Sequence, residues 1–492
     1  MPKTVILNAM LGQGHLSPLV GIATQLQARD DYEVQFLVNA VDRDAVVKQF
    51  ASMAPAAAAA RFAAEGAVAY DDPTRFEAIF SDMVEKGCMH LVGFNDARQA
   101  AVDAAVDDVL KTRDAGDVVG VVDFMSLAAG RALFKRGIPY YVTFPGPAGM
   151  LGVFGCADMP LPLELVAPYV ATRVVPSARR MMGEFFACVT QNADNAAGIF
   201  TSSIEAPDLC ACGGPSGSPR LHYVHTFSPP SDATCGPFVE AHPAAAALLD
   251  SPKPLVLVGG SSIPTQSLTA FGLSEILKAL RRGKDEWNVV LKVCHRETFE
   301  KALEKASFDV EAERGWFVAA AFIPQAPLLD RAACFVTHMG WNGTCEALQR
   351  GVPMLCTPVA VDQPINAAHC ASLGVALVLD TADPSSNGPT PGKDNHLRDP
   401  ERVAEADVYA KLTALVAADS PYRARATAVK DEHFPEGATD IGPAAVVAEL
   451  DRLFQVKKMT REYEVELAQH RASLAAAGGA QEAKVGEVAA AA

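Results

Sequence analysis

Short continuous hydrophobic runs alternate along the chain with longer segments whose apolar residues recur at helical spacing. Runs of four to eight apolar residues bounded by polar or Gly-rich turns are typical of strands buried on both faces of a parallel sheet. In the first half they cover residues 4–10, 33–38, 118–122, 139–143 and 199–205. In the second half they cover residues 255–258, 288–293, 316–321, 333–337, 353–357 and 376–379. The pattern predicts an α/β protein.

Helices are expected between these strands. The clearest begins at Pro18 and continues through Leu19, Ile22 and Leu26, which share one helical face. A further helix carrying Glu346 is predicted to begin near Gly343. Other helical segments are expected within 76–111 and at 266–281, 297–306, 364–373, 403–417 and 442–455.

The length of 492 residues is too great for one ordinary hydrophobic core, so two domains are expected. Composition shifts after Val224 to a segment rich in Pro, Gly, Ser and Ala, which is typical of a linker. The predicted boundaries are 1–225 for the first domain, 226–252 for the linker and 253–440 for the second domain. Residues 441–458 form a C-terminal helix, and 459–492 are a partly disordered tail.

Charge and cysteine content restrict the function. The formal net charge is 42 − 58 = −16, which argues against a nucleic-acid-binding surface. Eleven cysteines without a CxxC pair favour a reducing compartment over a disulfide framework or a zinc site. The first apolar run is too short for a signal peptide, and no run of 18 apolar residues predicts a membrane span. We therefore expect a cytoplasmic protein.

One strand-turn-helix segment carries residues suited to a phosphate. The strand 333–337 is followed by His338, Gly340, Trp341, Asn342 and Gly343. Backbone N–H groups at a helix start carry the positive end of the helix dipole, so this turn suits an anion. Asp362 and Gln363, after the next strand, offer acceptors and an amide to neighbouring sugar hydroxyls. An ordinary capped strand-turn-helix remains the alternative for any single residue.

The first strand is followed by a different kind of site. A Rossmann dinucleotide fingerprint would require glycine where Ser17 stands, which weakens a dehydrogenase interpretation. His15 follows the first strand, and Asp123 ends the strand 118–122. These residues can meet across the crevice at the carboxyl ends of parallel strands, where the carboxylate would orient the imidazole as a general base. The alternative for Asp123 is a helix N-cap.

The ordered motifs closely resemble those of the inverting UDP-dependent glycosyltransferases with the plant-type C-terminal signature. The N-terminal similarity is Gly14-His15-Leu16-Ser17-Pro18 together with Asp123. In the C-terminal half, the matching positions are Pro324, Gln325, Thr337, His338, Gly340, Trp341, Asn342, Glu346, Gly351, Val352, Pro353, Pro358, Asp362, Gln363, Asn366 and Ala367. The resemblance implies a GT-B fold, with two Rossmann-like doubly wound domains facing each other across a cleft. It departs from the signature at Phe322, where Trp is frequent, and at Gly343, where Ser is usual.

The resemblance also implies roles for individual residues. His15 would be the base and Asp123 its orienting partner, and Gly14 would be one of the donor-binding residues. Phe322 would stack on uracil, Gln325 would bond the uridine, and Glu346 the ribose. The diphosphate would lie against Gly260, Ser261, His338, Gly340, Trp341, Asn342 and Gly343. Asp362 and Gln363 would bind the sugar.

The predicted reaction moves a hexose, glucose by expectation, from a UDP-sugar to a hydroxyl of a small, fairly apolar acceptor, such as a lipophilic or phenolic compound. Phe124, Phe144 and Phe154 are candidate acceptor contacts. No metal or cofactor is implied, because the UDP-sugar is a co-substrate, and a monomer is expected. The alternatives are a nucleotide-sugar binding or regulatory protein without transfer, and a UDP-sugar epimerase on the same fold.

Overall fold

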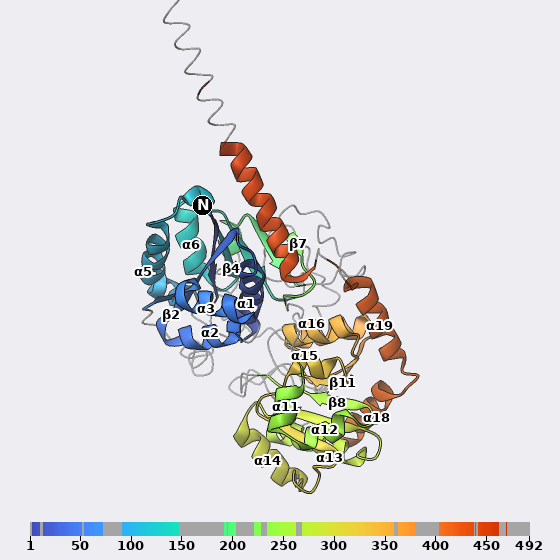
Figure 1. Ribbon diagram of the computed structural model, residues 1–492. Helices are drawn as coiled ribbons and strands as arrows, with labels where there is room; N and C mark the ends of the chain where they lie inside the picture. The colour runs from blue at the N-terminus through green and yellow to red at the C-terminus, as the bar shows by residue number, and fades with distance from the viewer. Residues whose placement is uncertain are drawn as a thin grey trace, which may run out of the picture.

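The computed structural model describes most of the chain. The described residues are 2–9, 13–51, 54–71, 91–146, 191–193, 195–202, 221–227, 234–261, 268–358, 363–379, 403–436, 438, 441–461 and 469. Figure 1 shows these residues in two lobes, the first drawn mainly in blue and cyan and the second in green to orange. Each lobe is built around one parallel sheet.

Within the described residues, the first sheet has seven strands in the order β3-β2-β1-β4-β5-β6-β7, and every pairing in it is parallel. Its strands are β1 (Lys3–Asn8), β2 (Tyr32–Asn39), β3 (Ala67–Tyr70), β4 (Val118–Asp123), β5 (Tyr140–Phe144), β6 (Gly198–Thr201) and β7 (Leu221–Tyr223). Its helices are α1 (Gln13–Gln27), α2 (Arg43–Ala51), α3 (Ala56–Arg61), α5 (Leu91–Leu110) and α6 (Leu127–Lys135), with short turns η1 (Ala40–Asp42), η2 (Phe62–Gly66) and η3 (Ala115–Asp117).

The second sheet has six described strands in the order β10-β9-β8-β11-β12-β13, again all parallel. They are β8 (Leu255–Val258), β9 (Asn288–Lys292), β10 (Phe317–Ala320), β11 (Ala332–Thr337), β12 (Met354–Cys356) and β13 (Ala376–Val378). The helices are α11 (Gly236–Ala241), α12 (Ala244–Leu249), α13 (Ala270–Arg282), α14 (Arg296–Ala306), α15 (Gln325–Leu329), α16 (Trp341–Arg350), α17 (Gln363–Ser372), α18 (Glu405–Val416) and α19 (Pro421–His433).

Both sheets are covered on their two faces, which explains why their strands are continuously hydrophobic. Successive side chains of a strand point to opposite faces. In β1, Ile6 packs in one hydrophobic cluster, whereas Val5 and Leu7 pack in another. In β8, Leu257 and Val256 are divided in the same way. The predicted pair of doubly wound α/β domains is therefore confirmed.

The chain returns to the first lobe at its C-terminal end. A helix over residues 442–461, drawn in red in Figure 1, lies along the N-terminal lobe. Its residues Val446, Leu450 and Phe454 are buried in the same cluster as Val5 and Leu7 of β1. The last helix thus packs on the first domain. Among the described residues, no helix is both long and apolar enough to span a membrane.

Some local expectations were wrong. α16 begins at Trp341 and not near Gly343, because Gly340 is extended and forms the N-cap. Inside the predicted linker 226–252, α11 and α12 pack Phe238, Ala245 and Leu248 into the second core. α19 was not expected, because only Ala426 and Val429 are buried along it and its hydrophobic periodicity is weak. The predicted loop 381–400 lies outside the described residues, as does all of the tail beyond 461 except residue 469.

Candidate active site

His15 and Asp123 meet at the point where the strand order of the first sheet reverses. β1 and β4 are hydrogen-bonded neighbours, and the two residues follow their carboxyl ends. The Nδ1 atom of His15 lies 3.0 Å from Oδ2 of Asp123. Asp123 is fully buried, and its Oδ1 accepts a hydrogen bond from the Met125 N–H at 3.0 Å. With Nδ1–H donating to the carboxylate, Nε2 is the ring atom that can accept a proton.

The turn after β4 holds Asp123 rigidly. The Phe124 N–H donates to the Thr143 carbonyl at 3.1 Å, which continues the pairing with β5. The side-chain amide of Asn192 donates to the carbonyls of Asp123 and Phe124 at 3.2 and 3.3 Å. Oδ1 of Asp123 therefore accepts from the backbone of the turn, and Oδ2 lies against the imidazole. The N-cap of helix α6 is Ser126 and not Asp123.

Aromatic rings line the apolar side of this pair. The ring of Phe124 lies 5.2 Å from the imidazole of His15, and the ring of Phe144 lies 5.0 Å from that of Phe124. Both phenylalanines are buried. An acceptor role for them stays a prediction, and Phe154 lies outside the described residues.

In the second domain the turn from β11 to α16 is tightly constrained. Met339 adopts a positive φ of 67°, its N–H donates to Thr337 Oγ1 at 3.2 Å, and its carbonyl accepts from the amide of Asn366 at 2.8 Å. The imidazole of His338 folds over Gly340, where a Cβ atom would lie 2.4 Å from Nε2. Only glycine fits at position 340, which explains its place in the motif.

The first turn of α16 presents backbone donors. The first intrahelical bond runs from the Thr344 N–H to the Gly340 carbonyl at 3.1 Å. The N–H groups of Trp341, Asn342 and Gly343 precede it and have no intrahelical acceptor. Such a set, with the positive end of the helix dipole, is suited to a phosphate oxygen.

Gln325 occupies the space between this helix start and the end of β8. Cβ atoms added to Gly259 or Gly343 would lie 3.7 Å from its Oε1 or 3.3 Å from its Nε2, respectively. Its amide donates to the carboxylate of Glu346 at 2.7 Å. The predicted uridine and ribose ligands are therefore adjacent. Phe322, the predicted uracil platform, is 78% exposed, so its ring face is available for stacking.

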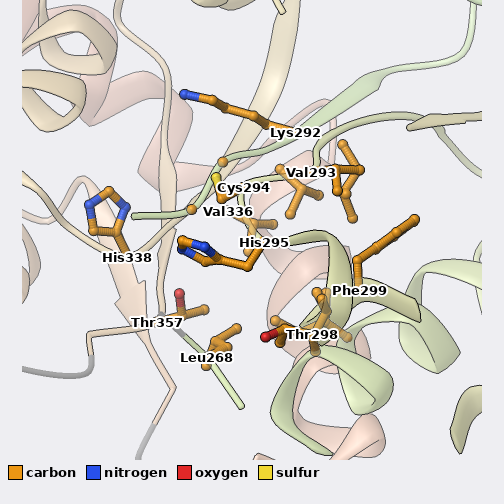
Figure 2. Close-up of a pocket in the computed structure, with 16 residues that line it drawn as sticks. Leu268, Lys292, Val293, Cys294, His295, Thr298, Phe299, Val336, His338 and Thr357 are labelled. Carbon is orange, nitrogen blue, oxygen red and sulfur yellow. The ribbon is translucent and has the colours of Figure 1, made fainter. Parts of the chain in front are cut away.

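A cavity of about 60 Å³ opens beside the ends of β8, β9 and β11 (Figure 2). Its lining includes Gly260 and His338, which the sequence singled out, and Lys292, Cys294 and His295, which it missed. The His295 ring is held by a contact of 3.1 Å from Nε2 to the Ser261 carbonyl. Lys292 ends β9, so its position at the carboxyl end of a parallel strand was the signal available in the sequence.

His338 and Lys292 both line this cavity, and they differ in the charge that they carry at physiological pH. His338 keeps some exposed surface as a whole, but its Nδ1 atom is buried without a hydrogen-bond partner among the described residues. Burial, and secondarily the nearby charge of Lys292, lowers the pKa of His338 to about 4. His338 is therefore neutral at physiological pH. Lys292 lines the same cavity and forms no ion pair within the described part of the chain.

The remaining predicted sugar ligands are only partly described. Gln363 is the first residue of α17 and is 1% exposed. Asp362 lies outside the described residues. Within the described residues, no group of three His, Cys, Asp or Glu side chains is arranged to hold a metal ion.

Two predicted diphosphate ligands contact the first domain. The Asn342 side-chain amide donates to the Gly14 carbonyl at 3.1 Å. The Trp341 indole N–H donates to Ser202 Oγ at 2.9 Å, and Cys345 Sγ lies 3.6 Å from the Ser202 carbonyl. The first turn of α16 thus touches both the first turn of α1, which carries His15, and the residue that follows β6.

Solved structures share this architecture. Medicago truncatula UGT71G1 complexed with UDP-glucose matches with a TM-score of 0.65 and 17% identity, over 92% of this chain and 98% of that one. Phytolacca americana UGT2 complexed with UDP-2fluoro-glucose and pterostilbene matches with a TM-score of 0.63 and 18% identity, over 92% and 99%. At such identities the likeness establishes the fold. The protein has the two-domain GT-B fold of glycosyltransferases.

Sequence comparison then relates part of the chain to a known family. Residues 263–401 match the family model described as UDP-glucoronosyl and UDP-glucosyl transferase. A UDP-glucosyl transferase of Saponaria officinalis is 37% identical over 99 residues, 19% of either chain. The indole-3-acetate beta-glucosyltransferase of Zea mays is 52% identical over 56 residues, 10% of this chain and 12% of the relative. The chain is therefore similar to UDP-glycosyltransferases over part of its length. Its alignments span only about a fifth or less of the length of these two relatives.

Proposed function

We propose that the protein transfers a hexose, preferentially glucose, from a UDP-sugar to a hydroxyl of a small, fairly apolar acceptor with inversion at the anomeric carbon. The observation that carries this proposal is the pair formed by His15 and the fully buried Asp123, 3.0 Å apart. A buried carboxylate on Nδ1 stabilises the imidazolium that forms when Nε2 takes a proton. This pair stands in a chain whose other domain matches a family of UDP-sugar users.

The proposed step is a single displacement. His15 Nε2 removes the proton of the acceptor hydroxyl, and the oxygen forms a bond to the anomeric carbon of the sugar. The bond from that carbon to the diphosphate oxygen breaks on the opposite face, and its electron pair leaves with UDP. The proton stays on His15, where Asp123 balances the charge until the imidazolium returns it to water.

The second domain would stabilise the leaving diphosphate. The N–H groups at the start of α16 and a neutral His338 ring donate hydrogen bonds, and Lys292 contributes a positive charge. Gln325 and Glu346 would hold the uridine and ribose, and Phe322 would stack on uracil. Asp362 and Gln363 would bind the sugar. Such local donors are needed because the protein as a whole carries a formal charge of −16. We assign this reaction to the cytoplasm.

The alternative functions require fewer of these residues. A nucleotide-sugar binding protein requires the donor residues but no buried carboxylate behind a histidine in the other domain. An epimerase requires no acceptor base either. Finding the epimer of a UDP-sugar after incubation without acceptor would favour the second alternative.

A mass-spectrometric screen with UDP-glucose tests the proposal. Acceptor pools should include phenols, sterols and polyketides, and also indole-3-acetate and a flavonol rhamnoside, because relatives are named for such compounds. The expected result is a product heavier by one hexose, with a β linkage by NMR from the α-linked donor. If UDP-glucose binds without being hydrolysed and no acceptor pool yields a product, the result would favour a nucleotide-sugar binding protein instead.

A further inference from the structure

The carbonyl of Gly14 is available to the other domain because of a proline one turn later. α1 runs from Gln13 to Gln27 and contains Pro18. In an α-helix the N–H of residue 18 would bond to the carbonyl of residue 14. Proline has no N–H, so this bond cannot form. Pro18 stands beyond the first four helical positions, where a missing N–H would have had no consequence.

The side chain of Asn342, in the second domain, donates to the Gly14 carbonyl in place of the missing N–H. Its Nδ2 atom donates to the Gly14 carbonyl at 3.1 Å, across 328 positions of sequence. Gly14 directly precedes His15, and Asn342 lies in the first turn of α16, where the donor diphosphate is proposed to bind. This hydrogen bond therefore links the residue before the proposed base to the proposed donor site.

A second contact shows that the first turn of α16 is a docking point. Trp341, next to Asn342, donates its indole N–H to Ser202 Oγ at 2.9 Å, and Ser202 is 1% exposed. Trp341 itself is 3% exposed. The two neighbouring side chains thus hold the start of α16 against the first turn of α1 and against the end of β6.

We propose that Pro18 is a positioning residue: by lacking an N–H it reserves the Gly14 carbonyl for Asn342, and this bond sets the placement of His15 relative to the donor. The expected effect on kcat rests on the proposed function, whereas the hydrogen bond between Asn342 and Gly14 does not. Pro18 touches no reacting atom, and its effect passes through Gly14.

The test is the variant Pro18→Ala, which restores a helical N–H that competes with Asn342 for the Gly14 carbonyl. We expect kcat to fall about two- to tenfold, the range for one neutral hydrogen bond, while the KM for the UDP-sugar changes little. Pro421→Ala is the matched control. Pro421 is the first residue of α19, where its missing N–H has no helical acceptor, so kcat should stay at the wild-type value.

A double-variant cycle with Asn342→Ala separates this role from general destabilisation. If both substitutions act through one bond, the kcat of the double variant equals that of Asn342→Ala alone. Multiplicative losses of kcat would overturn the proposal. So would a wild-type kcat for Pro18→Ala.

Hydrogen–deuterium exchange provides a readout that does not depend on turnover. In Pro18→Ala, peptides covering α16 and the end of β6 should exchange faster than in wild type or Pro421→Ala. Unchanged exchange would refute the interdomain bond. Absence of glycosyl transfer in the wild-type protein would count against the proposed function alone, because the exchange measurement would still decide the role of Pro18.

Discussion

Nδ1 of His15 lies 3.0 Å from Oδ2 of Asp123, although the two residues are 108 positions apart in the chain. The contact spans the neighbouring strands β1 and β4, whose carboxyl ends border the crevice of the first domain. With Nδ1–H donating to this carboxylate, Nε2 is the ring atom that can accept a proton.

Replacing His15 by Ala is expected to lower turnover by about 10²–10⁴-fold, because general base catalysis contributes that range. UDP affinity, measured by calorimetry, should be nearly unchanged, since the predicted UDP ligands other than Gly14 lie in the other domain. Asp123→Asn is the companion variant. Its NH₂ group must face either the Met125 N–H or the His15 Nδ1–H, so kcat should also fall. Unchanged turnover in His15→Ala would eliminate the proposed base.

Glu346→Ala is expected to weaken UDP binding about tenfold, because one charged acceptor for the ribose is lost. The amide of Gln325 also loses the carboxylate that it contacts at 2.7 Å. The role is checked by comparing UDP with UDP that lacks both ribose hydroxyls. Wild type should prefer UDP, and the variant should bind the two ligands alike. A preference retained in the variant would remove Glu346 from the ribose site.

Lys292→Met should raise the Kd for UDP about tenfold and reduce its dependence on salt, since an unpaired charge near the diphosphate is removed. Lys301→Met is the control: Lys301 is exposed on α14 and pairs with Glu297 at 2.6 Å. Fluorescence or calorimetric titration at two salt concentrations measures both effects. Identical titrations of wild type and Lys292→Met would show that this lysine does not face the donor.

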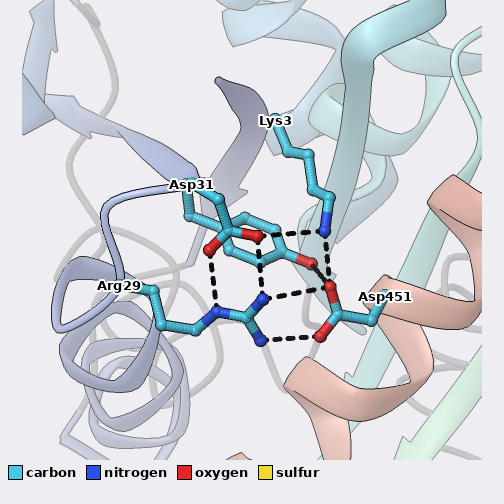
Figure 3. A network of polar contacts seen from close by, with 5 residues as sticks. Lys3, Arg29, Asp31 and Asp451 are labelled. Carbon is cyan, nitrogen blue, oxygen red and sulfur yellow. Dashed lines mark hydrogen bonds and ion pairs between the residues drawn. The ribbon is translucent and has the colours of Figure 1, made fainter. Parts of the chain in front are cut away.

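Asp451→Ala is expected to destabilise the first domain by about 1–3 kcal/mol, because charged hydrogen bonds lose their common acceptor. Asp451, in the C-terminal helix, accepts from Lys3 at 2.6 Å, from Arg29 at 2.6 Å and from the Tyr32 hydroxyl at 3.0 Å (Figure 3). Burial raises the pKa of Asp451, but these hydrogen bonds outweigh it and hold the pKa below its ordinary value.

Urea unfolding measures this effect. Glu300→Ala breaks an exposed pair with Arg296 on α14 and should cost only about 0.3–0.5 kcal/mol. Because the folded-state pKa of Asp451 is depressed, its stabilisation is complete above the unfolded pKa of about 3.9 and disappears as pH falls further. Equal costs for the two variants at pH 7 would contradict a role in docking the helix.

The burial of His369 is expected to lower the stability of the folded protein in mild acid. It is 3% exposed, neither ring nitrogen has a hydrogen-bond partner among the described residues, and its ring lies 5.8 Å from that of Trp341. Burial, and then the charge of His433, lowers the pKa of His369 from 6.5 to about 4. Between these values the unfolded chain binds a proton that the folded protein does not, so stability falls as pH falls.

The variant His369→Met should flatten this slope by up to about 1.4 kcal/mol per pH unit between pH 6.5 and 4. Unfolding in urea across this range measures the slope, and measurements at pH 7–8, where both forms are neutral, provide the baseline. Parallel curves for wild type and variant would show that His369 does not titrate differently in the two states.

Local pattern was sufficient for much of the fold. Continuous apolar runs predicted strands covered on both faces, and β8 covers the same residues, Leu255–Val258, as its predicted run. Elements with little buried surface were missed, of which α19 is the clearest case. The start of α16 was misplaced because the cap is Gly340, and a glycine in such a segment gives no side-chain signal for a cap.

Some residues of the candidate site could likewise be predicted from the sequence, and others could not. Residue type and order selected His15, Asp123, His338 and Glu346, because catalytic and binding groups follow the ends of parallel strands. Gln325 was selected only by the resemblance to the family signature. Lys292 was missed because a lysine at the end of an amphipathic segment resembles any solvated charge. Its significance depends on the neighbours that the sheet order β9-β8-β11 gives it.

The sequence by itself determined the α/β class, the two sheets and the motif residues, since periodicity and strand-end chemistry are local properties. Only the tertiary structure decided which of these residues touch: Asp123 with His15, Gln325 with Glu346, and Asn342 with the Gly14 carbonyl. These contacts join elements far apart in the chain. Their geometry depends on strand order and on how the two domains meet, and no local pattern encodes either.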